Sequence, residues 1–358
     1  MTTGNVKPVN PMASVRPTGM GNAGYGLCLA FGVNGISEAC YMRVNDGKLS
    51  RLSKILVRWW ISEKVMLENQ NALLIFATHH APILSNGRRI VVVHDLICVN
   101  HFKQSPIQAF VFVLCAPLVA VSASVFVAIS NNAAAEWNKR FGCIRKVDAV
   151  IPSISSFLNE LQPGRNTLAE RRRFGQVLFV GGNYRHKALD FAIDVVRCAR
   201  SSGLAVQLLV VGTDWSVWEH SIGLSDVDLR KEGIVIERYC TSERLREEYQ
   251  RSICLFFPSK EEGLGFPPLE AAACGCPVIC NNLPVLIEIA GSFADFVETG
   301  DVLGGVEAIH RLFDANYESV LDSKIEAGLM RAECFRASRI ENAWKKLLAG
   351  ISLNERVI

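Results

Sequence analysis

The sequence carries little charge for its length: Asp, Glu, Lys and Arg together make up 20% of its 358 residues, and the formal net charge is +3. A dedicated nucleic-acid-binding protein needs a strongly basic face, so this balance argues against that class. Hydrophobic residues make up 49% of the chain, which is enough for a large core and argues against extensive disorder. The length favours two domains, and neither an internal repeat nor a low-complexity segment stands out.

The chain also lacks cysteines at paired spacing, although it contains twelve of them. Residues 1–12 are polar and contain no apolar segment of the kind found in a secretory signal. Free, mostly buried thiols in a reducing cytoplasm fit these two observations best. Cys274 and Cys276 are the one close pair. Since no histidine lies near them in the sequence, we expect small core residues at a turn rather than a metal site.

One stretch with almost no charge, residues 106–129, is long enough to suggest a membrane span. Pro117 and the Ser122-Ala123-Ser124 break interrupt it. A helix over 104–118 followed by a buried strand over 125–129 accounts for the same residues without a bilayer. Contact of this segment with a membrane surface is the alternative.

Two charged features are discounted as sites. Arg171-Arg172-Arg173 lies between the two halves of the chain and is interpreted as a solvated connector, with a phosphate-facing rim as the alternative. Asp226-Val227-Asp228 has the D-x-D form of a divalent-ion site. It lies in a polar stretch rather than beside glycines, which favours a solvated surface.

Short apolar runs alternate with helical patterns along the chain, which is the signature of β-α-β units and parallel sheets. Most runs are continuously apolar, as expected of strands covered on both faces. We therefore predict an α/β protein with two Rossmann-like domains, residues 1–165 and 166–335, joined at a turn-rich linker over 161–166. Residues 336–358 are expected to form a helix that packs back across the domains. The predicted strands are 73–76, 90–93, 125–129, 177–180, 206–211, 234–236, 255–257 and 278–279.

Ligands of such sheets bind at the carboxyl ends of the strands, so polar residues that directly follow a strand are candidates for a site. The strongest candidate is the segment 258–270. Gly263 and Gly265 allow a tight turn close to a ligand, and Pro267 or Pro268 can open a helix without losing a hydrogen bond. The N-terminus of that helix would present free N–H groups and the positive end of a dipole to a diphosphate.

Two glutamates frame this loop. Glu270, expected in the first turn of the helix, can accept hydrogen bonds from two vicinal hydroxyls such as those of a ribose. Glu262 lies eight positions earlier and can hold the hydroxyls of a second sugar. The alternative for Glu270, that it complements the helix N-terminus, does not account for both glutamates with two glycines and two prolines in this order.

Residues 258–280 resemble the donor-site signature of the retaining GT-B enzymes of glycosyltransferase family 4, in which two glutamates form an E-x7-E motif. The spacing, the loop glycines and the following helix, turn and strand all agree. The resemblance implies two Rossmann-like domains that face each other across a cleft. It assigns the donor sugar to Glu262 and the nucleotide ribose to Glu270. It assigns the sugar diphosphate to the loop residues Gly263, Leu264 and Gly265.

A second candidate loop follows the strand at 177–180 and reads Gly181-Gly182-Asn183-Tyr184-Arg185-His186-Lys187. Glycines allow close backbone approach to a phosphate, and a lysine is a point charge suited to its oxygens. The loop is similar to the family's glycine turn followed by a basic pair, which implies that Lys187 binds the diphosphate. Many members place an arginine directly after the first glycine, where this chain has Gly182-Asn183. Arg185 or His186 is therefore left to supply the second cation.

In the N-terminal half, His94-Asp95 closes the strand at 90–93. A lone histidine is more often structural. The pair resembles the family's HD motif, however, which implies that His94 approaches the donor sugar. His79 and His80 end the preceding strand and are expected, with Asp95, on the acceptor side.

The glycine cluster over residues 19–26 is weak evidence by itself. A dinucleotide fingerprint needs a clear strand before it and an acidic residue about twenty positions later. Asp46 lies near that distance, but residues 6–15 scarcely support a strand. The cluster resembles the family's N-terminal glycine loop, which faces the acceptor and the donor phosphates. The residues carried over are Gly21, Gly24 and Tyr25.

With these residues, the family resemblance implies a retaining glycosyltransferase that moves a mannose- or glucose-like hexose from a GDP- or UDP-sugar to a hydroxyl of a glycan or lipid-linked saccharide in bacterial envelope synthesis. Glu262, His94 and Lys187 are the expected catalytic residues. Lys187, the loop amides and the helix dipole would stabilise the leaving diphosphate, so neither a metal nor a permanently bound cofactor is expected. The expected location is cytoplasmic, with peripheral contact at the inner membrane and no nucleic-acid partner.

Two other enzyme classes remain open. A nucleotide-sugar epimerase or hydrolase of the same architecture would use the same cleft and convert the donor without any acceptor. An NAD-dependent dehydrogenase would explain the glycine loop and the parallel sheets, but not the paired glutamates.

Overall fold

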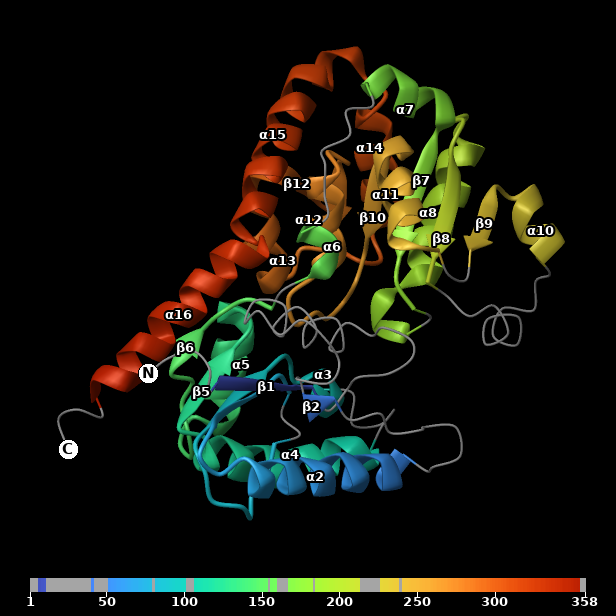
Figure 1. Ribbon diagram of the computed structural model, residues 1–358. Coiled ribbons are helices and arrows are strands. Elements are labelled where there is room, and N and C mark those ends of the chain that lie inside the picture. Colours follow the sequence, from blue (N-terminus) through green and yellow to red (C-terminus); the bar gives the residue numbers. More distant parts are fainter. Residues whose placement is uncertain are drawn as a thin grey trace. The chain divides into compact units, whose positions relative to one another are not determined.

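The computed structural model describes residues 6–10, 40–41, 51–78, 81–100, 106–153, 155–159, 167–182, 184–212, 226–237 and 240–354. The chain divides into two compact units: residues 1–159 together with 335–358 (unit 1), and residues 160–334 (unit 2). Each unit contains a six-stranded sheet in which every pair of neighbouring strands is parallel (Figure 1). The predicted α/β class with two parallel sheets is therefore confirmed.

The sheet of unit 1 has the strand order β2-β1-β3-β4-β5-β6. Its strands are β1 (Val6–Asn10), β2 (Cys40–Tyr41), β3 (Leu73–Phe76), β4 (Arg89–Val93), β5 (Val125–Ala128) and β6 (Ala149–Val150). The three strands predicted in this half correspond to β3, β4 and β5. The others were missed because β2 and β6 are two residues long and because Lys7 and Pro8 break the apolar run of β1. Register explains how Pro8 is accommodated: β1 pairs with β2 only at Val9 and Asn10, beyond the proline.

Helices α2 and α4 lie side by side against the sheet of unit 1 (Figure 1). The helices of this unit are α2 (Arg51–Glu68), α3 (Ile97–Asn100), α4 (Pro106–Ser122), α5 (Asn131–Phe141), α6 (Ser156–Asn159) and α16 (Ala337–Asn354). Trp137 of α5 is fully buried at the centre of the core, with its ring centroid 4.6 Å from that of Phe126 and 4.8 Å from that of Phe141. Such aromatic contacts add to the stabilisation from burial.

The nearly uncharged segment 106–129 folds as a helix followed by a buried strand, α4 and β5, as predicted. The helix continues through Pro117 to Ser122 and is thus longer than expected. Within the described ranges, no helix combines the length and the apolar character that crossing a bilayer requires.

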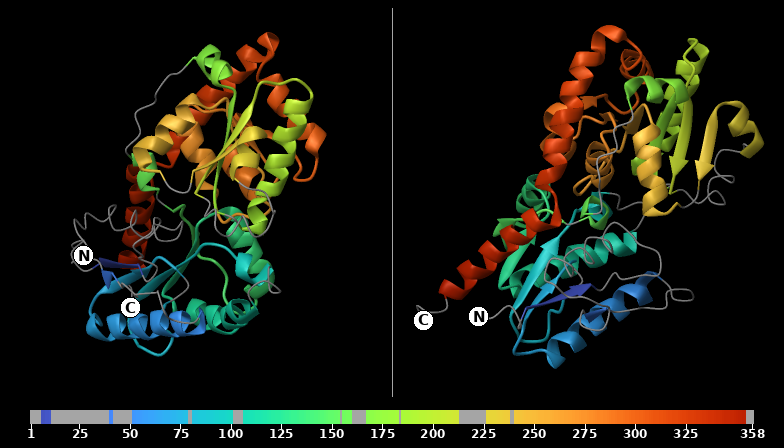
Figure 2. Two further views of the ribbon diagram at one scale, coloured as in Figure 1. Left: turned by 90° about the vertical axis from the view of Figure 1, so that its right-hand side faces the viewer. Right: turned by 45° about the horizontal axis from the view of Figure 1, so that its top comes forward.

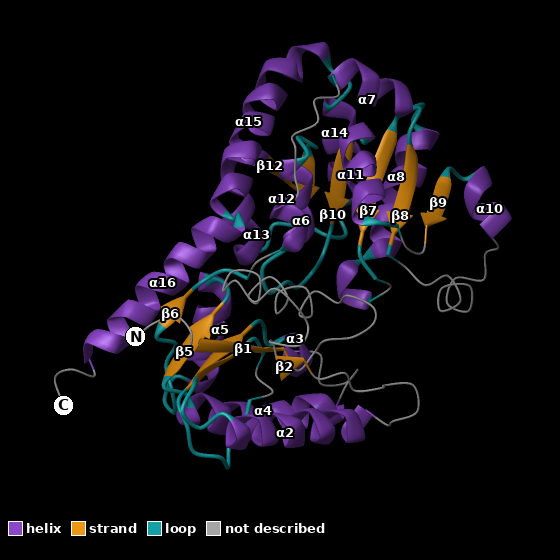
Figure 3. Ribbon diagram, in the orientation of Figure 1, coloured by secondary structure: helices purple, strands orange, loops and turns teal. Residues whose placement is uncertain are grey.

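The sheet of unit 2 has the order β12-β11-β10-β7-β8-β9 (Figure 3). Its strands are β7 (Gln176–Val180), β8 (Gln207–Val211), β9 (Ile234–Glu237), β10 (Cys254–Phe257), β11 (Val278–Cys280) and β12 (Ala294–Phe296). Only β12 was missed, because its three residues contain Asp295 and form no apolar run. Strands β8 and β9 lie in succession on one side of β7. Strands β10, β11 and β12 lie in succession on its other side, which is the Rossmann order. The strand order therefore reverses between β7 and β10, and this topological switch point is where such sheets bind ligands.

Both faces of the second sheet are covered by helices. The helices are α7 (Leu168–Phe174), α8 (Leu189–Ser201), α10 (Asp226–Lys231), α11 (Ser242–Arg251), α12 (Phe266–Ala273), α13 (Pro284–Ala290), α14 (Val302–Arg311) and α15 (Glu318–Cys334), with short 3-10 helices η3 (Arg185–Lys187), η4 (Gly291–Phe293) and η5 (Ala315–Tyr317). Helices α8 and α14 share a core with the strands on one face. Helix α11 lies on the opposite side of the sheet from α8 (Figure 2, left).

The arginine run in α7 differs from its predicted role as a solvated connector. Arg171 is buried and donates to the carbonyl of Ser252 at 3.3 Å. Arg172 donates to the carbonyls of Leu312 at 2.8 Å and Asp314 at 3.1 Å. A guanidinium offers five donors in a planar fork, so these two side chains fasten α7 to loops of unit 2. The prediction was wrong because sequence cannot say which carbonyls lie within reach.

Candidate active site

The candidate site of unit 2 lies at the point where the strand order reverses. Strand β10 pairs with β7 in parallel, so their carboxyl ends lie at the same edge of the sheet. The loop after β7 covers residues 181–188, and the loop after β10 covers residues 258–265. The two strongest motifs of the sequence therefore leave the sheet side by side.

These loops bring Lys187 and Glu262 into contact, although the two residues are 75 positions apart in the chain. The ammonium group of Lys187 donates to Oε1 of Glu262 in an ion pair, and their side chains are 18% and 10% exposed. The same ammonium lies 5.3 Å from the ring centroid of Phe257, at the end of β10. A cation is thus held at the edge of the sheet in surroundings that screen charge less than water does.

Backbone bonds also join the two loops. The carbonyl of His186 accepts a hydrogen bond from the backbone N–H of Lys260 at 2.6 Å. The buried hydroxyl of Ser259 lies 3.2 Å from the same carbonyl and 3.0 Å from that of Glu261. The lysine-bearing loop and the glutamate-bearing loop are therefore tied together next to the ion pair.

Two residues that the sequence analysis missed support the glutamate-bearing loop. The buried Asn281, directly after β11, donates from Nδ2 to the carbonyl of Ser259 at 2.9 Å and accepts from the N–H of Thr299 at 3.2 Å. The hydroxyl of Thr299, just beyond β12, donates to the carbonyl of Pro258 at 2.8 Å. Asn281 could have been found, because it is a polar residue that follows a strand run. Thr299 follows the strand that was not predicted.

The turn before α12 requires glycine at position 265. Gly265 has φ +92°, in the left-handed region, and a Cβ added there would lie 2.9 Å from Cδ2 of Leu286 and 3.0 Å from Cδ1 of Ile289. Backbone strain therefore disfavours any other residue, and a Cβ would also require the ends of the Leu286 and Ile289 side chains to shift. The expected tight turn is present.

Helix α12 begins one residue before the prolines, at Phe266. Pro267 and Pro268 therefore occupy its second and third positions and contribute no N–H to its first turn. The dipole remains, but the helix end offers fewer donors than expected. Glu270 is the fifth residue rather than part of the first turn, so that expectation was wrong. Its carboxylate Oε2 lies 3.3 Å from the hydroxyl of Tyr249 in α11.

The other residues predicted in this unit have varied surroundings. Arg185 is exposed on η3, and the ring of His186 stacks on that of Tyr184 with centroids 5.6 Å apart and planes inclined by 17°. Leu264 is buried.

Cys274 and Cys276 are also buried, and burial raises the pKa of both thiols, that of Cys276 to about 11. Both residues are therefore small core residues at a turn, as expected.

In unit 1, His94 is buried directly after β4, and its Nε2 lies 2.6 Å from the carbonyl oxygen of Ala77. Burial lowers the pKa of His94, so the ring is neutral near pH 7. A carbonyl can only accept, so Nε2 carries the proton and Nδ1 is an acceptor. Asp95 accepts from the N–H of Ile97, the first residue of α3, at 3.1 Å, which forms an Asx turn before the helix. Six predicted site residues lie outside the described residues: Gly21, Gly24, Tyr25, His79, His80 and Asn183.

Comparison with known proteins agrees with this geometry. Residues 175–315 match the family described as Glycosyl transferases group 1. The chain is 27% identical over 283 residues to the O-antigen chain mannosyltransferase RfbU of Salmonella typhimurium strain LT2, covering 75% of this chain and 73% of the relative. Solved structures also share the fold. A sucrose-phosphate synthase from Thermosynechococcus elongatus has a TM-score of 0.75 at 16% identity, covering 98% of this chain and 99% of that one. Anabaena HepE in complex with UDP has a TM-score of 0.70 at 15% identity, covering 97% and 100%.

The matched family region contains both loops of the candidate site and the E-x7-E glutamates. The chain is a glycosyltransferase whose residues 175–315 match the group 1 family, and its two parallel sheets are those of the GT-B fold. The predicted enzyme class is therefore confirmed, and the dehydrogenase alternative is set aside.

Proposed function

We propose that this glycosyltransferase moves a hexose, with mannose the first candidate, from a GDP- or UDP-sugar to a hydroxyl of a glycan or lipid-linked saccharide, with retention of configuration. The proposal places this step in the synthesis of a bacterial envelope polysaccharide. An O-antigen chain mannosyltransferase among the relatives supports the choice of mannose and of a saccharide acceptor. The observation that carries the proposal is the contact of Lys187 with Glu262 at the switch point of the second sheet.

The charges of the site suit a sugar diphosphate. During transfer the diphosphate leaves with negative charge, and the anomeric carbon becomes oxocarbenium-like. In this proposal Lys187 stabilises the leaving diphosphate, aided by the backbone of Gly263 to Gly265 and the dipole of α12. Because its side chain is only 18% exposed, the ammonium acts with little screening by water.

Glu262 and Glu270 accept hydrogen bonds from hydroxyl groups of the donor. Without a ligand, Glu262 neutralises Lys187. When the donor binds, the ammonium turns to a phosphate oxygen and the carboxylate of Glu262 accepts hydroxyls of the sugar, so each group exchanges one charged partner for the ligand. Glu270, on the helix that follows, accepts the hydroxyls of the nucleotide ribose.

In unit 1 we assign His94 to the donor sugar. Its unprotonated Nδ1 can accept a hydrogen bond from a hydroxyl, and the neutral ring adds no positive charge beside a developing cation. The acceptor-side role that the resemblance implies is kept for Asp95, His79, His80 and the glycine loop. No side chain is assigned as a covalent nucleophile, so retention is ascribed to same-face attack assisted by the leaving phosphate.

We further propose that α4 contacts the membrane that carries a lipid-linked acceptor. Large apolar side chains recur along this helix at helical spacing and remain exposed: Ile107, Phe110, Leu114, Leu118 and Val121. Trp60 of the adjacent α2 is 64% exposed. Exposed apolar stripes of this kind suit the boundary between lipid headgroups and acyl chains.

A thermal-shift panel tests the donor. GDP-mannose, UDP-glucose, GDP and UDP are added separately, and the true donor should raise the melting temperature most, because a ligand at 100 times its Kd stabilises by about 2.7 kcal/mol. Turnover is then followed with and without a saccharide acceptor. Release of nucleotide that depends on the acceptor supports transfer, whereas equal consumption of donor without acceptor would identify a hydrolase or an epimerase. The absence of any shift with all four ligands would overturn the proposal.

A further inference from the structure

Tyr249 of α11 is fully buried, and its hydroxyl meets the carboxylate of Glu270 in α12. Buried tyrosine hydroxyls require a hydrogen-bond partner. Here the partner is Oε2 of Glu270 at 3.3 Å, which is long for a bond between two oxygens. A bond of this length orients the carboxylate without immobilising it.

The direction of this hydrogen bond follows from electrostatics. Burial, together with the negative charge of Glu270, raises the pKa of Tyr249 well above its ordinary value. The phenol therefore keeps its proton near neutral pH, and the carboxylate is the acceptor. An ionised carboxylate has about four lone-pair sites, so the bond from Tyr249 at Oε2 does not by itself block ligand hydroxyls at the same group.

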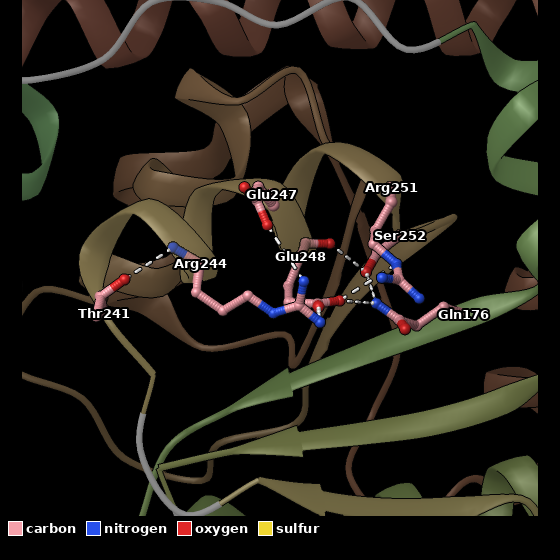
Figure 4. Close-up of polar contacts among 7 residues, drawn as sticks. All are labelled: Gln176, Thr241, Arg244, Glu247, Glu248, Arg251 and Ser252. Atoms are coloured by element: carbon pink, nitrogen blue, oxygen red, sulfur yellow. Dashed lines mark hydrogen bonds and ion pairs between the residues drawn. The ribbon is translucent and has the colours of Figure 1, made fainter.

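Tyr249 is held in place through the residue that precedes it. The carboxylate of Glu248 is fully buried, accepts from Nε2 of Gln176 at 2.6 Å and forms ion pairs with Arg244 and Arg251 (Figure 4). Gln176 begins strand β7, so these contacts fasten α11 to the central strand of the sheet. Packing of α11 thereby fixes the position from which the phenol reaches α12.

We propose that Tyr249 is a positioning residue that orients the carboxylate of Glu270 toward the two vicinal hydroxyls of the nucleotide ribose. The inference rests on the proposed donor role of Glu270. A carboxylate already turned toward the ligand loses less rotamer freedom on binding, which converts into affinity. This advantage exists only when the ligand presents the hydroxyl groups.

The test measures ribose preference rather than activity. Binding of GDP, UDP and their 2′-deoxy forms is measured by calorimetry for the wild type, Tyr249→Phe and Glu270→Gln. The wild type is expected to prefer the ribonucleotide by about tenfold or more, the scale of a hydrogen bond to a charged group. Tyr249→Phe should reduce that preference to about threefold and leave affinity for the 2′-deoxy form unchanged. Glu270→Gln should reduce the preference further.

Tyr317→Phe is the matched control, because the Tyr317 hydroxyl lies 3.1 Å from both carboxylate oxygens of Asp295 elsewhere in unit 2. It removes the same atom from the same kind of bond and should keep the full preference, even where its melting temperature falls as much as that of Tyr249→Phe. Full preference retained in Tyr249→Phe, or no preference in the wild type, would overturn the inference while the proposed function stands. A wild type that binds neither GDP nor UDP would instead overturn the proposed function, and the inference with it.

Discussion

The ammonium of Lys187 and the carboxylate of Glu262 form an ion pair between loops that leave the neighbouring strands β7 and β10. Lys187→Ala removes the positive charge proposed to stabilise the departing diphosphate. Loss of one preorganised charge-stabilising group lowers kcat by about 10²–10³-fold, and we expect a loss of that size in a transfer assay. Lys260→Ala is the control, because it removes an exposed lysine from the second loop and leaves the backbone bond to His186 intact. Near-normal turnover of Lys187→Ala would refute this role.

The ion pair leads to a second prediction, in which nucleotide affinity and the rate of transfer respond differently to one substitution. In Glu262→Gln the ammonium of Lys187 no longer has a carboxylate competing with the diphosphate. Affinity for GDP or UDP alone should therefore stay equal or increase, while transfer falls by about 10²-fold or more because the sugar loses a charged acceptor. Calorimetry and initial rates measure the two effects. Glu261→Gln, the same change one position earlier, should alter neither, and weaker nucleotide binding in Glu262→Gln would contradict the exchange of partners.

The buried His94 predicts a pH dependence of stability. Its pKa is lowered in the folded protein, whereas in the unfolded chain it is about 6.5. Above about pH 6.5 both states carry a neutral ring, and below it the unfolded state binds the proton first. Stability should therefore fall as the pH drops from about 6.5 toward the lower folded pKa, by at most about 1.4 kcal/mol per pH unit.

Thermal unfolding of the wild type and of His94→Gln between pH 5 and 8 measures this contribution, with that window set by the ordinary histidine pKa of about 6.5. Glutamine keeps an N–H donor for the carbonyl of Ala77 but does not titrate. The stability difference between the two proteins should shrink as the pH falls. A difference that stays constant with pH would show that His94 does not titrate on unfolding.

The carboxylate of Glu248 predicts a large loss of stability without direct contact with the donor. Its side chain is fully buried and pairs with Arg244 and Arg251, which are 43% and 33% exposed (Figure 4). Removing it takes the carboxylate acceptor from the buried Nε2 of Gln176, and leaving a buried donor without its acceptor costs about 1–3 kcal/mol. Glu248→Ala should lower the free energy of unfolding by this amount in denaturant titrations. The adjacent Glu247, whose side chain is 63% exposed, also pairs with Arg244. Glu247→Ala should cost less than about 1 kcal/mol, and similar costs for both variants would disprove the buried network.

The exposed face of α4 predicts binding to lipid vesicles. Phe110→Ser with Leu114→Ser should lower sedimentation with anionic vesicles at low salt by about tenfold or more, because inserting each side chain is worth about 1.5–3 kcal/mol. The control is Leu303→Ser with Met330→Ser, which replaces apolar residues in unit 2 that are even more exposed than Phe110 and Leu114. Failure of the wild type to bind vesicles, or equal loss in both double variants, would remove the membrane proposal.

Sequence patterns predicted most of the strands and the core of the site. Continuous apolar runs identified eight of the strands because burial on both faces leaves no polar alternation. Polar residues directly after the runs pointed to Lys187 and Glu262, because chain direction alone places them at the carboxyl edge. Short strands were missed where one polar residue or a proline interrupts the run, as Pro8 does in β1 and Asp295 in β12.

The sequence by itself determined the two parallel sheets, the glycine turn at Gly265 and the family motif of the donor loop. These depend on local periodicity, backbone sterics and residue spacing, which the order of residues contains. Only the tertiary structure decided that Lys187 meets Glu262, that Arg171 is buried and that Tyr249 reaches Glu270. Each of these contacts joins residues from different elements, and their distance depends on strand order and helix packing rather than on any local pattern.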